Sequence, residues 1–279
     1  MKISNIPGKK FWCYPKFFLR LIIAFFKSLF YLIKQRPVKI VSTGGLIAVP
    51  VCLAGKLLRI PIELYELNVI PGKAVRFLSP LAKNIFVIFK KSQDFFKQKV
   101  NLCKYPLRFT DNDKIFNKKE LLEKLSFDTN KKTIFLTGGS HGSLFLNNII
   151  KNLVIESGFV RENGQIIHQT GDNDKTDWKS FYANHKIPAH VFSYDPNIKD
   201  FYLLSDLIIC RGGAGTLFEI KFFQKKAIVI PIKSLALGHQ LENAIEMERL
   251  YPELFSFFDP ELDSISLQTR KYLQELSSI

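Results

Sequence analysis

The chain has 279 residues, of which 47% are hydrophobic and 23% are charged, enough for one large domain or two ordinary ones. Its four cysteines, Cys13, Cys52, Cys103 and Cys210, lie far apart and form no C-x-x-C pair, which disfavours a disulfide framework or a metal cluster. We therefore expect a globular protein of a reducing cytosol in which each cysteine is a small buried hydrophobe.

The formal net charge of +15 is distributed unevenly. Residues 1–109 hold 20 Lys and Arg against three acidic residues, whereas residues 110–279 hold 20 against 22. All of the excess positive charge therefore belongs to the first part of the chain. Such a basic face suits nucleic acid or an anionic membrane surface. The segment contains no recognised nucleic-acid-binding module, so no nucleic-acid partner is expected.

Residues 17–33 form the most apolar run, yet they contain Arg20 and Lys27, so a membrane span is not expected. On a helix, four basic residues would form one stripe beside a broad apolar face: Lys16, Arg20, Lys27 and Lys34. That pattern is typical of a helix lying in a membrane interface. A domain helix that packs its phenylalanines inward fits equally well, and both interpretations can hold for different faces. No small-residue cleavage site follows, which disfavours a signal peptide.

Strand and helix patterns alternate along the rest of the chain, which predicts parallel sheets. In the first part we expect strands at 39–43, 61–65 and 85–89 and a helix at 46–58. Residues 104–131, with a lysine-rich helix at 118–124, are typical of a domain crossover. Beyond it we expect strands at 133–137, 165–170, 189–192, 206–210 and 227–231. Helices are expected from 144, over 216–223 and from 238.

Two glycine loops each stand between a strand and a helix, at 138–143 and at 211–216. Such loops let backbone N–H groups and the positive end of a helix approach an anion closely, and two of them at neighbouring strand ends suit one diphosphate. Glu219 either caps its helix together with Thr216 or accepts hydrogen bonds from a sugar diol. Neither loop has the pattern of a nicotinamide site.

Acidic and amide residues at three other positions in the chain are further candidates for ligand or metal binding. Glu66 and Asn68 follow a strand's carboxyl end, where ligands of open α/β sheets bind, although a polar turn before Pro71 fits as well. Gln240 and Asn243 share one helix face, where uncharged amides suit sugar hydroxyls. The two Asp-x-Asp motifs, at 111–113 and 172–174, lie in hydrophilic loops, so no metal site is expected.

Six motifs in order carry a resemblance that covers residues 7 to 250: TGG at 43–45, ELNVIPG at 66–72, GGSHG at 138–142, HQTG at 168–171, RGGAGTLFE at 211–219 and HQLENA at 239–244. In this series the chain resembles the MurG family of glycosyltransferases. The resemblance implies an α/β fold of GT-B type, with two doubly wound Rossmann-like domains facing a cleft. An acceptor- and membrane-facing domain would occupy residues 1–109, and a UDP-sugar-binding domain residues 110–279.

The activity implied by the resemblance is the transfer of N-acetylglucosamine from UDP-GlcNAc to lipid I, the undecaprenyl-linked muramoylpentapeptide, which forms lipid II for peptidoglycan. The reaction would be inverting and would need neither metal nor cofactor. It would take place at the cytoplasmic face of the bacterial inner membrane, with the protein bound peripherally to the anionic surface.

The resemblance also assigns site residues. For the donor, Ser140 would contact the diphosphate region, Thr216 a phosphate, Glu219 the ribose hydroxyls, and Gln240 with Asn243 the GlcNAc, while Arg108 matches a further donor element. The phosphate loops would use Gly138, Gly139, Gly142, Gly212, Gly213 and Gly215. Gly44, Gly45 and Asn68 would lie on the acceptor side.

Two departures from the family bear on catalysis. Residues 65–68 are YELN where the family commonly has HEQN. The family's opening strand, its glycine-rich loop with a histidine and its first helices have no counterpart, so we expect an incomplete first domain. A misassigned start, a second chain that completes the domain, or a decayed copy would each explain this. Because that histidine is the family's candidate base, Glu66 is our candidate here. The alternative function is an inactive or subunit-dependent, membrane-associated protein that binds a UDP-sugar.

Overall fold

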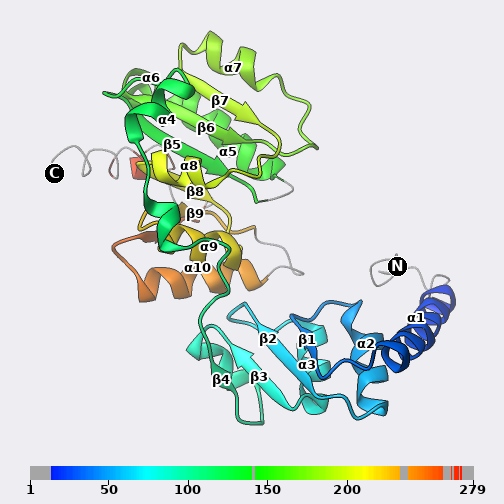
Figure 1. Ribbon diagram of the computed structural model, residues 1–279. Coiled ribbons are helices and arrows are strands. Elements are labelled where there is room, and N and C mark those ends of the chain that lie inside the picture. Colours follow the sequence, from blue (N-terminus) through cyan, green and yellow to red (C-terminus); the bar gives the residue numbers. More distant parts are fainter. Residues whose placement is uncertain are drawn as a thin grey trace. The chain divides into compact units, whose positions relative to one another are not determined.

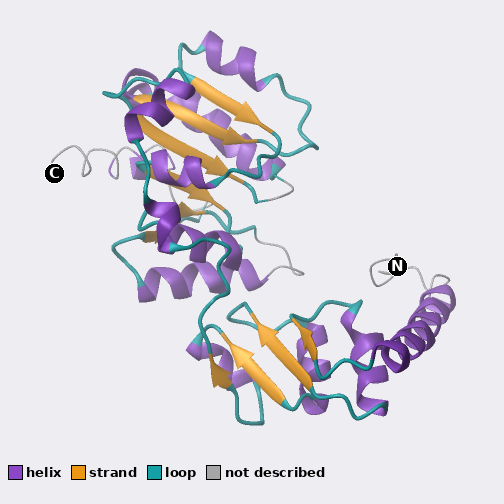
Figure 2. Cartoon of the chain, in the orientation of Figure 1, coloured by secondary structure: helices purple, strands orange, loops and turns teal. Residues whose placement is uncertain are grey.

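The structure is a computed structural model that describes residues 14–139, 142–232 and 238–259, together with Ile265, residues 267–269 and Lys271. The chain divides into two compact units, Met1–Tyr105 and Pro106–Ile279 (Figures 1 and 2). Each is described by itself.

The boundary lies four residues before the predicted one at 109/110, because Arg108 and Phe109 belong to the second unit. The Phe109 ring stacks on Phe222 with 6.4 Å between ring centroids and lies edge-on to Phe223 at 5.0 Å. Arg108 binds the carboxylate of Glu219 in the same unit. These contacts hold the end of the crossover segment on the second unit.

The first unit contains a parallel sheet of strand order β1-β2-β3-β4. Its strands are β1 (Ile40–Ser42), β2 (Ile62–Glu66), β3 (Asn84–Val87) and β4 (Asn101–Leu102). Its helices are α1 (Tyr14–Gln35), α2 (Ala48–Leu57) and α3 (Lys73–Leu78), with 3-10 turns η2 (Ser79–Leu81) and η3 (Lys90–Phe95). The predicted strands and helix are confirmed. Strand β4 was not predicted from the sequence, because it has only two residues and both are exposed.

Helix α1 has three faces. Phe17, Ala24 and Leu32 are buried. Helix α1 packs beside α2 (Figure 1). A second face exposes eight large hydrophobic side chains: Phe18, Leu19, Ile22, Ile23, Phe26, Phe30, Tyr31 and Ile33. The third holds the exposed basic residues Lys16, Arg20, Lys27 and Lys34. The packing interpretation therefore holds for the buried face, while the membrane-interface interpretation stays a prediction for the two exposed faces. No helix among the described residues is long and apolar enough to cross a membrane.

The second unit contains a parallel sheet of strand order β10-β9-β8-β5-β6-β7. Its strands are β5 (Lys132–Thr137), β6 (Gly164–Gln169), β7 (Ala189–Phe192), β8 (Leu207–Cys210), β9 (Lys226–Val229) and β10 (Phe255–Phe257). The chain runs outward from β5 to β7, returns to β8 beside β5, and then runs outward in the opposite direction. This is a doubly wound sheet whose topological switch point lies between β5 and β8.

Helices connect these strands on both faces of the sheet (Figure 2). They are α4 (Lys118–Lys124), α5 (Leu144–Glu156), α6 (Gly158–Asn163), α7 (Trp178–Asn184), α8 (Lys199–Leu204), α9 (Ala214–Phe222) and α10 (Gly238–Leu250), with the 3-10 turn η4 (Asp111–Lys114). The predicted strands and helices are confirmed to within two residues at their starts. Helices α6, α7 and α8 and strand β10 were not predicted, because helices of six or seven residues and a strand of three are too short to show an apolar period.

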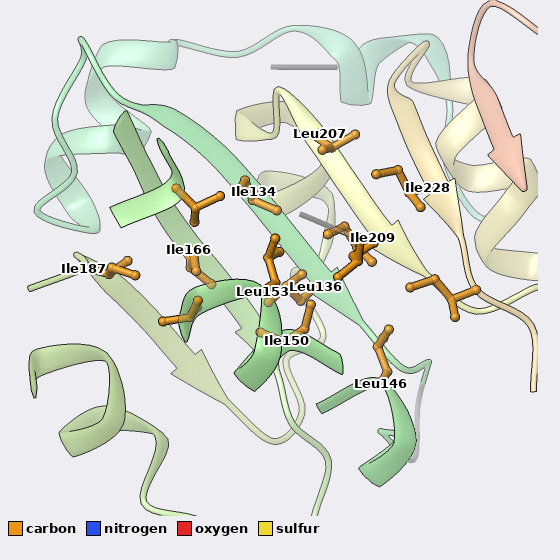
Figure 3. Packing of buried hydrophobic residues seen from close by; sticks show 14 of the residues in the cluster. Ile134, Leu136, Leu146, Ile150, Leu153, Ile166, Ile187, Leu207, Ile209 and Ile228 are labelled. Carbon is orange, nitrogen blue, oxygen red and sulfur yellow. The ribbon is translucent and has the colours of Figure 1, made fainter. Parts of the chain in front are cut away.

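The core explains why the central strands are continuous apolar runs. Ile134 and Leu136 of β5 pack with Ile150 of α5 in one cluster, shown in Figure 3. Phe135 points to the other face, where its ring lies 5.8 Å from that of Phe201 on α8. Both faces of the strand are therefore covered by helices, as parallel sheets require.

The described cysteines are unpaired. Cys52 and Cys210 are buried, as expected, but Cys103 is only half-buried, because it follows the exposed strand β4. Cys13 lies outside the described residues.

Candidate functional site

The two glycine loops of the second unit leave the sheet side by side. Strands β5 and β8 pair in parallel, with Thr137 opposite Cys210 at their carboxyl ends. The loop that begins at Gly138 and the loop that begins at Arg211 therefore start next to each other, at the switch point. The predicted juxtaposition is confirmed, and it is the position where open α/β sheets bind ligands.

Close backbone packing explains the glycines of the first loop. Gly142 has a φ of +67°, and a Cβ there would lie 2.3 Å from the carbonyl oxygen of Thr170. A Cβ at Gly138 would lie 2.5 Å from the backbone nitrogen of Ser143. Gly139, with a φ of +81°, donates its N–H to Thr137 Oγ1. The loop is thus pressed against the turn that follows β6. Ser140 lies outside the described residues.

A cavity of about 240 Å³, the switch-point pocket, opens where these loops meet. It is lined by Gly142, Ser143, Leu144, Phe145, Thr170, Asn173, Asp174, Arg211 and Ile232. Asn173 and Asp174 belong to the Asp-x-Asp motif that we placed away from any site. That expectation is wrong, because the turn after β6 lies at the same sheet edge as the glycine loops.

Arg211 is a site residue that the sequence analysis did not single out. It directly follows β8 and lines the switch-point pocket, and its Nε donates to Gln240 Oε1 over 3.3 Å. Burial lowers the pKa of Arg211 from its usual value, although a guanidinium remains charged near neutral pH. A cation between a strand end and a glycine loop is the signal that could have identified it.

A buried hydrogen-bond network fixes the turn after β6. His168 is fully buried, with its Nε2 3.1 Å from Asn147 Oδ1 and its Nδ1 2.9 Å from the Tyr182 hydroxyl. Asn147 Nδ2 donates to the carbonyl of Thr170 and to Asp174. Because Nδ2 is the donor of that amide, its Oδ1 accepts, so His168 donates from Nε2 and accepts at Nδ1.

The network has a defined charge state. Burial lowers the pKa of His168 to about 3 against the opposing charge of Asp174, so the imidazole is neutral. Burial opposes the ionisation of Asp174, but the hydrogen bonds that it accepts outweigh this and lower its pKa to about 2. One of these bonds comes from Trp178 Nε1. The turn therefore holds an ionised Asp174 in the lining of the pocket that Arg211 also lines.

Glu219 is held by two distant partners. Arg108 Nε donates to its Oε1 over 2.9 Å, and the hydroxyl of Tyr202 donates to its Oε2 over 2.9 Å. Tyr202 is buried, which together with the carboxylate raises its pKa well above the usual value. Helix α9 begins after Gly213 and has no side-chain cap. The capping interpretation of Glu219 is therefore wrong, because the helix already begins at Ala214, two residues before Thr216.

The start of α10 is locked onto the second glycine loop. A Cβ at Gly212 would lie 2.1 Å from the carbonyl oxygen of Gln240. Asn243 is fully buried, and its Nδ2 donates to the carbonyl of Gly212 over 3.2 Å. We expected Asn243 to face a sugar with Gln240, but the structure turns it toward the loop. Gly213 has open space around it, and Gly215 and Thr216 lie in the first turn of α9.

The first unit has its own cavity, the first-unit pocket, of about 530 Å³. It is lined by Thr43, Gly45, Leu46, Val49, Glu66, Asn68, Gly72, Lys73, Ala74, Val75 and Phe77. Gly44 and Gly45 have φ values of +89° and +84°, and a Cβ at Gly44 would lie 2.5 Å from Val75 Cγ2. Only glycine lets this loop pass so close to α3. Of the predicted acceptor-side residues, Gly45 and Asn68 line this cavity, and Gly44 directly precedes Gly45.

Glu66 lies at the base of this cavity and is buried. Its Oε1 accepts from the backbone N–H and the Nδ2 of Asn68, and its Oε2 accepts from the N–H of Gly72. The carboxylate therefore closes the 66–72 loop on itself. The structure gives Glu66 a role in shaping the pocket in addition to the catalytic role expected from the sequence.

Within the described ranges, no three His, Cys, Asp or Glu side chains gather to hold a metal ion. In the 111–113 motif, Asp113 accepts from Thr110 and pairs with Lys199 at 3.1 Å. The hydrogen bond from the Thr110 backbone and those from the two side chains lower the pKa of Asp113. This motif fixes η4 and does not line the switch-point pocket.

Comparison with known proteins gives two matching family models. The glycosyltransferase family 28 N-terminal domain matches residues 1–87, and the glycosyltransferase family 28 C-terminal domain matches residues 133–257. Among solved structures, Acinetobacter baumannii MurG aligns with a TM-score of 0.66 and 20% identity over 92% of this chain and 69% of that chain. The S. aureus MnaA-UDP co-structure aligns with a TM-score of 0.63 and 12% identity over 93% and 72%. These structures confirm the expected GT-B fold.

Two of the curated relatives, from Myxococcus xanthus and Thermosipho africanus, are each named UDP-N-acetylglucosamine--N-acetylmuramyl-(pentapeptide) pyrophosphoryl-undecaprenol N-acetylglucosamine transferase. The Myxococcus xanthus relative is 29% identical over 88% of this chain and 62% of its own length. The Thermosipho africanus relative is 33% identical over 78% of this chain and 58% of its own length. The chain thus spans about three fifths of the length of these relatives.

Proposed function

Because the chain belongs to glycosyltransferase family 28, we propose that it transfers N-acetylglucosamine from UDP-GlcNAc to an undecaprenyl-diphosphate-linked muramoylpentapeptide. The observation that carries the proposal is the pair of glycine loops at the switch point of the second unit, with Arg211 between them. The names of the relatives supply the donor and the acceptor.

The switch-point pocket is the proposed diphosphate site. In the reaction an acceptor hydroxyl attacks the anomeric carbon and gives its proton to a general base, the bond to the UDP oxygen breaks, and negative charge develops on the leaving diphosphate. The Arg211 guanidinium and the N–H groups at the start of α9 stabilise that charge. Glu219, fixed by Arg108 and Tyr202, accepts from the ribose hydroxyls with its remaining lone pairs. Gln240, oriented by Arg211, faces the sugar.

The first-unit pocket is the proposed acceptor site. The 43–45 loop, Asn68 and Lys73 line it, and Lys73 supplies a cation for an acceptor diphosphate. Glu66 holds Asn68 in place. Helix α1, with its apolar and basic faces, is the proposed contact with an anionic membrane surface, which for this chemistry is the cytoplasmic face of the inner membrane.

The test is transfer of labelled GlcNAc from UDP-GlcNAc to the lipid-linked acceptor in detergent by the full chain. We expect labelled product with the wild type, and a drop of roughly 100-fold in kcat with Arg211→Gln, the loss typical of removing one group that stabilises the developing charge. Lys179→Gln, an exposed change on α7, serves as the matched control. A chain that neither binds UDP-GlcNAc nor transfers the sugar would contradict the proposal.

A binding-only protein is the second candidate, and one observation favours it. Glu66, the base candidate from the sequence, has its carboxylate engaged by N–H donors on both oxygens. The same assay separates the candidates, because UDP-GlcNAc binding without labelled product would select the second.

A further inference from the structure

The switch-point pocket contains a negative charge as well as a positive one. Among the described residues that line it, the two that carry charge are Arg211 and Asp174. Arg211 attracts the diphosphate of the proposed donor, whereas the carboxylate of Asp174 repels it. Asp174 therefore weakens the binding of every phosphate in this pocket, and it weakens the binding of the more highly charged ones most.

The carboxylate of Asp174 is held in place by donors that do not neutralise it. Its Oδ2 accepts from Asn147 Nδ2 over 2.7 Å and from Trp178 Nε1 over 3.0 Å, and its Oδ1 accepts from the backbone N–H of Thr176 over 2.9 Å. Because Asn147 and Trp178 are buried, turning the carboxylate away from the pocket would leave buried donors unpaired. All three donors are uncharged, so the carboxylate keeps its full charge. Both of its oxygens are engaged by the protein, which favours a fixed charge over a metal ligand.

The donor and the product of the proposed reaction differ in charge. In UDP-GlcNAc both phosphates are bridging groups, and each carries one negative charge. Transfer of the sugar leaves UDP with a terminal phosphate, whose second proton dissociates near pH 6, so at pH 8 UDP carries about one negative charge more. The pocket has a volume of only about 240 Å³, so this charge lies within about a Debye length of the carboxylate. Repulsion by Asp174 is therefore stronger for the product than for the donor.

We propose that Asp174 makes the switch-point pocket distinguish the donor from the product by charge, which favours UDP-GlcNAc and promotes the release of UDP. This inference rests on the proposed function for the identity of the two ligands. It gives the 172–174 turn a role in selectivity rather than in metal binding. The same repulsion disfavours UTP, which carries the charge of a further phosphate.

The test compares affinities measured by calorimetry on the full chain at pH 8 in the presence of EDTA. For each protein the Kd of UDP-GlcNAc is divided by the Kd of UDP. We expect Asp174→Asn to tighten UDP relative to UDP-GlcNAc and so to raise this ratio by roughly threefold to tenfold, the effect of removing one unit charge at the edge of a pocket. Asp172→Asn is the matched control, because Asp172 is an exposed carboxylate of the same turn that does not line the pocket. It should leave the ratio unchanged.

A second variant tests the same effect without disturbing the hydrogen bonds of Asp174. Asn173 is exposed and lines the pocket, so Asn173→Asp adds a carboxylate there. We expect it to weaken UDP relative to UDP-GlcNAc, so that the ratio falls by a similar factor. Opposite changes of the ratio in the two variants cannot come from a general loss of stability.

Two results would overturn the proposal. One is an unchanged ratio in Asp174→Asn that still binds UDP, or in Asn173→Asp if the first variant does not fold. The other is UDP binding that requires Mg²⁺ in the wild type and is lost in Asp174→Asn, because the carboxylate would then be a metal ligand. Failure of the proposed function gives a different result, since the wild type itself would then bind neither nucleotide.

Discussion

Glu219 is the residue whose role depends most on its neighbours. Its carboxylate joins Arg108, from the crossover segment, to the buried Tyr202 hydroxyl on α8. These bonds fix both oxygens and leave lone pairs that face away from the two partners. Such a carboxylate is suited to a cis-diol, and its orientation is set before any ligand binds.

The binding of UDP and of 2′-deoxy-UDP by Glu219→Ala tests whether this carboxylate binds the ribose diol. If the carboxylate binds the ribose diol, the change weakens UDP binding by roughly 1.5–3 kcal/mol, the scale of a lost charged hydrogen bond. The wild type should prefer UDP to 2′-deoxy-UDP in calorimetry, and the variant should not. Glu253→Ala, at an exposed carboxylate, is the control. The melting temperature also falls, because Tyr202 loses its partner, but an unchanged preference for UDP would exclude a direct contact.

The buried His168 predicts a pH dependence of stability. Its folded-state pKa of about 3 lies below the usual 6.5, so only the unfolded chain takes up a proton as pH falls. The stability of the neutral form is complete above pH 6.5 and is lost progressively toward pH 3. Between pH 7 and pH 5 this group costs about 2 kcal/mol of unfolding free energy.

Denaturant unfolding at both pH values measures this loss. His168→Gln should be less stable at pH 7 but should show a pH dependence reduced by about that amount. His185→Gln, which changes a histidine outside the network, should keep the wild-type slope. If His168→Gln also keeps the wild-type pH dependence of stability, His168 is not the group responsible for it.

At the scale of elements, the second glycine loop and α10 are packed backbone to backbone. Gly212 lies so close to the backbone of Gln240 that a Cβ would clash with it, and Asn243 of the helix donates a hydrogen bond to the Gly212 carbonyl in the loop. The loop and the helix therefore form one rigid edge of the switch-point pocket, and the position of Gln240 follows from the size of residue 212.

Two alanine variants separate packing from flexibility. Gly212→Ala places a Cβ 2.1 Å from the Gln240 oxygen, so α10 must move, at a cost of about 1–3 kcal/mol. Gly213→Ala has no atom within 4 Å and a φ of −74°, so the fold should keep its stability to within about 0.5 kcal/mol. Chemical denaturation of both variants gives the comparison. Equal stabilities would show that the loop and α10 are not in contact in solution.

Helix α1 exposes large hydrophobic side chains and basic residues on adjacent faces. Its basic residues should bind vesicles containing phosphatidylglycerol, at about 1 kcal/mol each, and its phenylalanines should add a part insensitive to salt. Co-sedimentation should therefore weaken at high salt without vanishing. Replacing Arg20 and Lys27 by Glu should remove most of the binding and leave UDP-GlcNAc affinity unchanged.

A charge-matched control makes this test specific. Lys83 and Lys97 are exposed basic residues of the same unit that lie outside α1. Changing both to Glu alters the net charge equally, yet it should reduce vesicle binding much less. If the two double variants behave alike, the attraction comes from net charge and not from the helix.

The proposed donor and acceptor sites belong to different units of the chain. The switch-point pocket, Glu219 and Arg108 all belong to residues 106–279, and the first-unit pocket and α1 belong to residues 1–105. Because each unit has its own sheet and core, donor binding should not need the first unit.

Two fragments test this division. Residues 106–279 should bind UDP-GlcNAc in calorimetry with an affinity within a fewfold of that of the full chain. Residues 110–279 should bind more weakly and melt earlier, because they lack Arg108 and the Phe109 ring that stacks on Phe222. Equal behaviour of the two fragments would place the boundary at 109/110 after all. A folded longer fragment without millimolar affinity would refute donor binding by this unit.

The features that are local in the chain could be predicted from the sequence alone. Strands such as β5 and β8, the glycine loops after them and the start of α10 follow from apolar runs, from glycine and from short-range periodicity. The ordered series of motifs gave the family and the GT-B fold, since six motifs in sequence constrain a chain far more than any single one.

Contacts between side chains that are far apart in the sequence could be identified only from the tertiary structure. The contact of Arg108 with Glu219 joins residues 111 positions apart, and Asn147 reaches Asp174 from another element. It also turned Asn243 inward, brought the 172–174 turn to the pocket and closed the 66–72 loop on Glu66. The physical reason is that a side chain's partner depends on the order and register of the strands that carry it, and residue spacing along the chain does not contain that order.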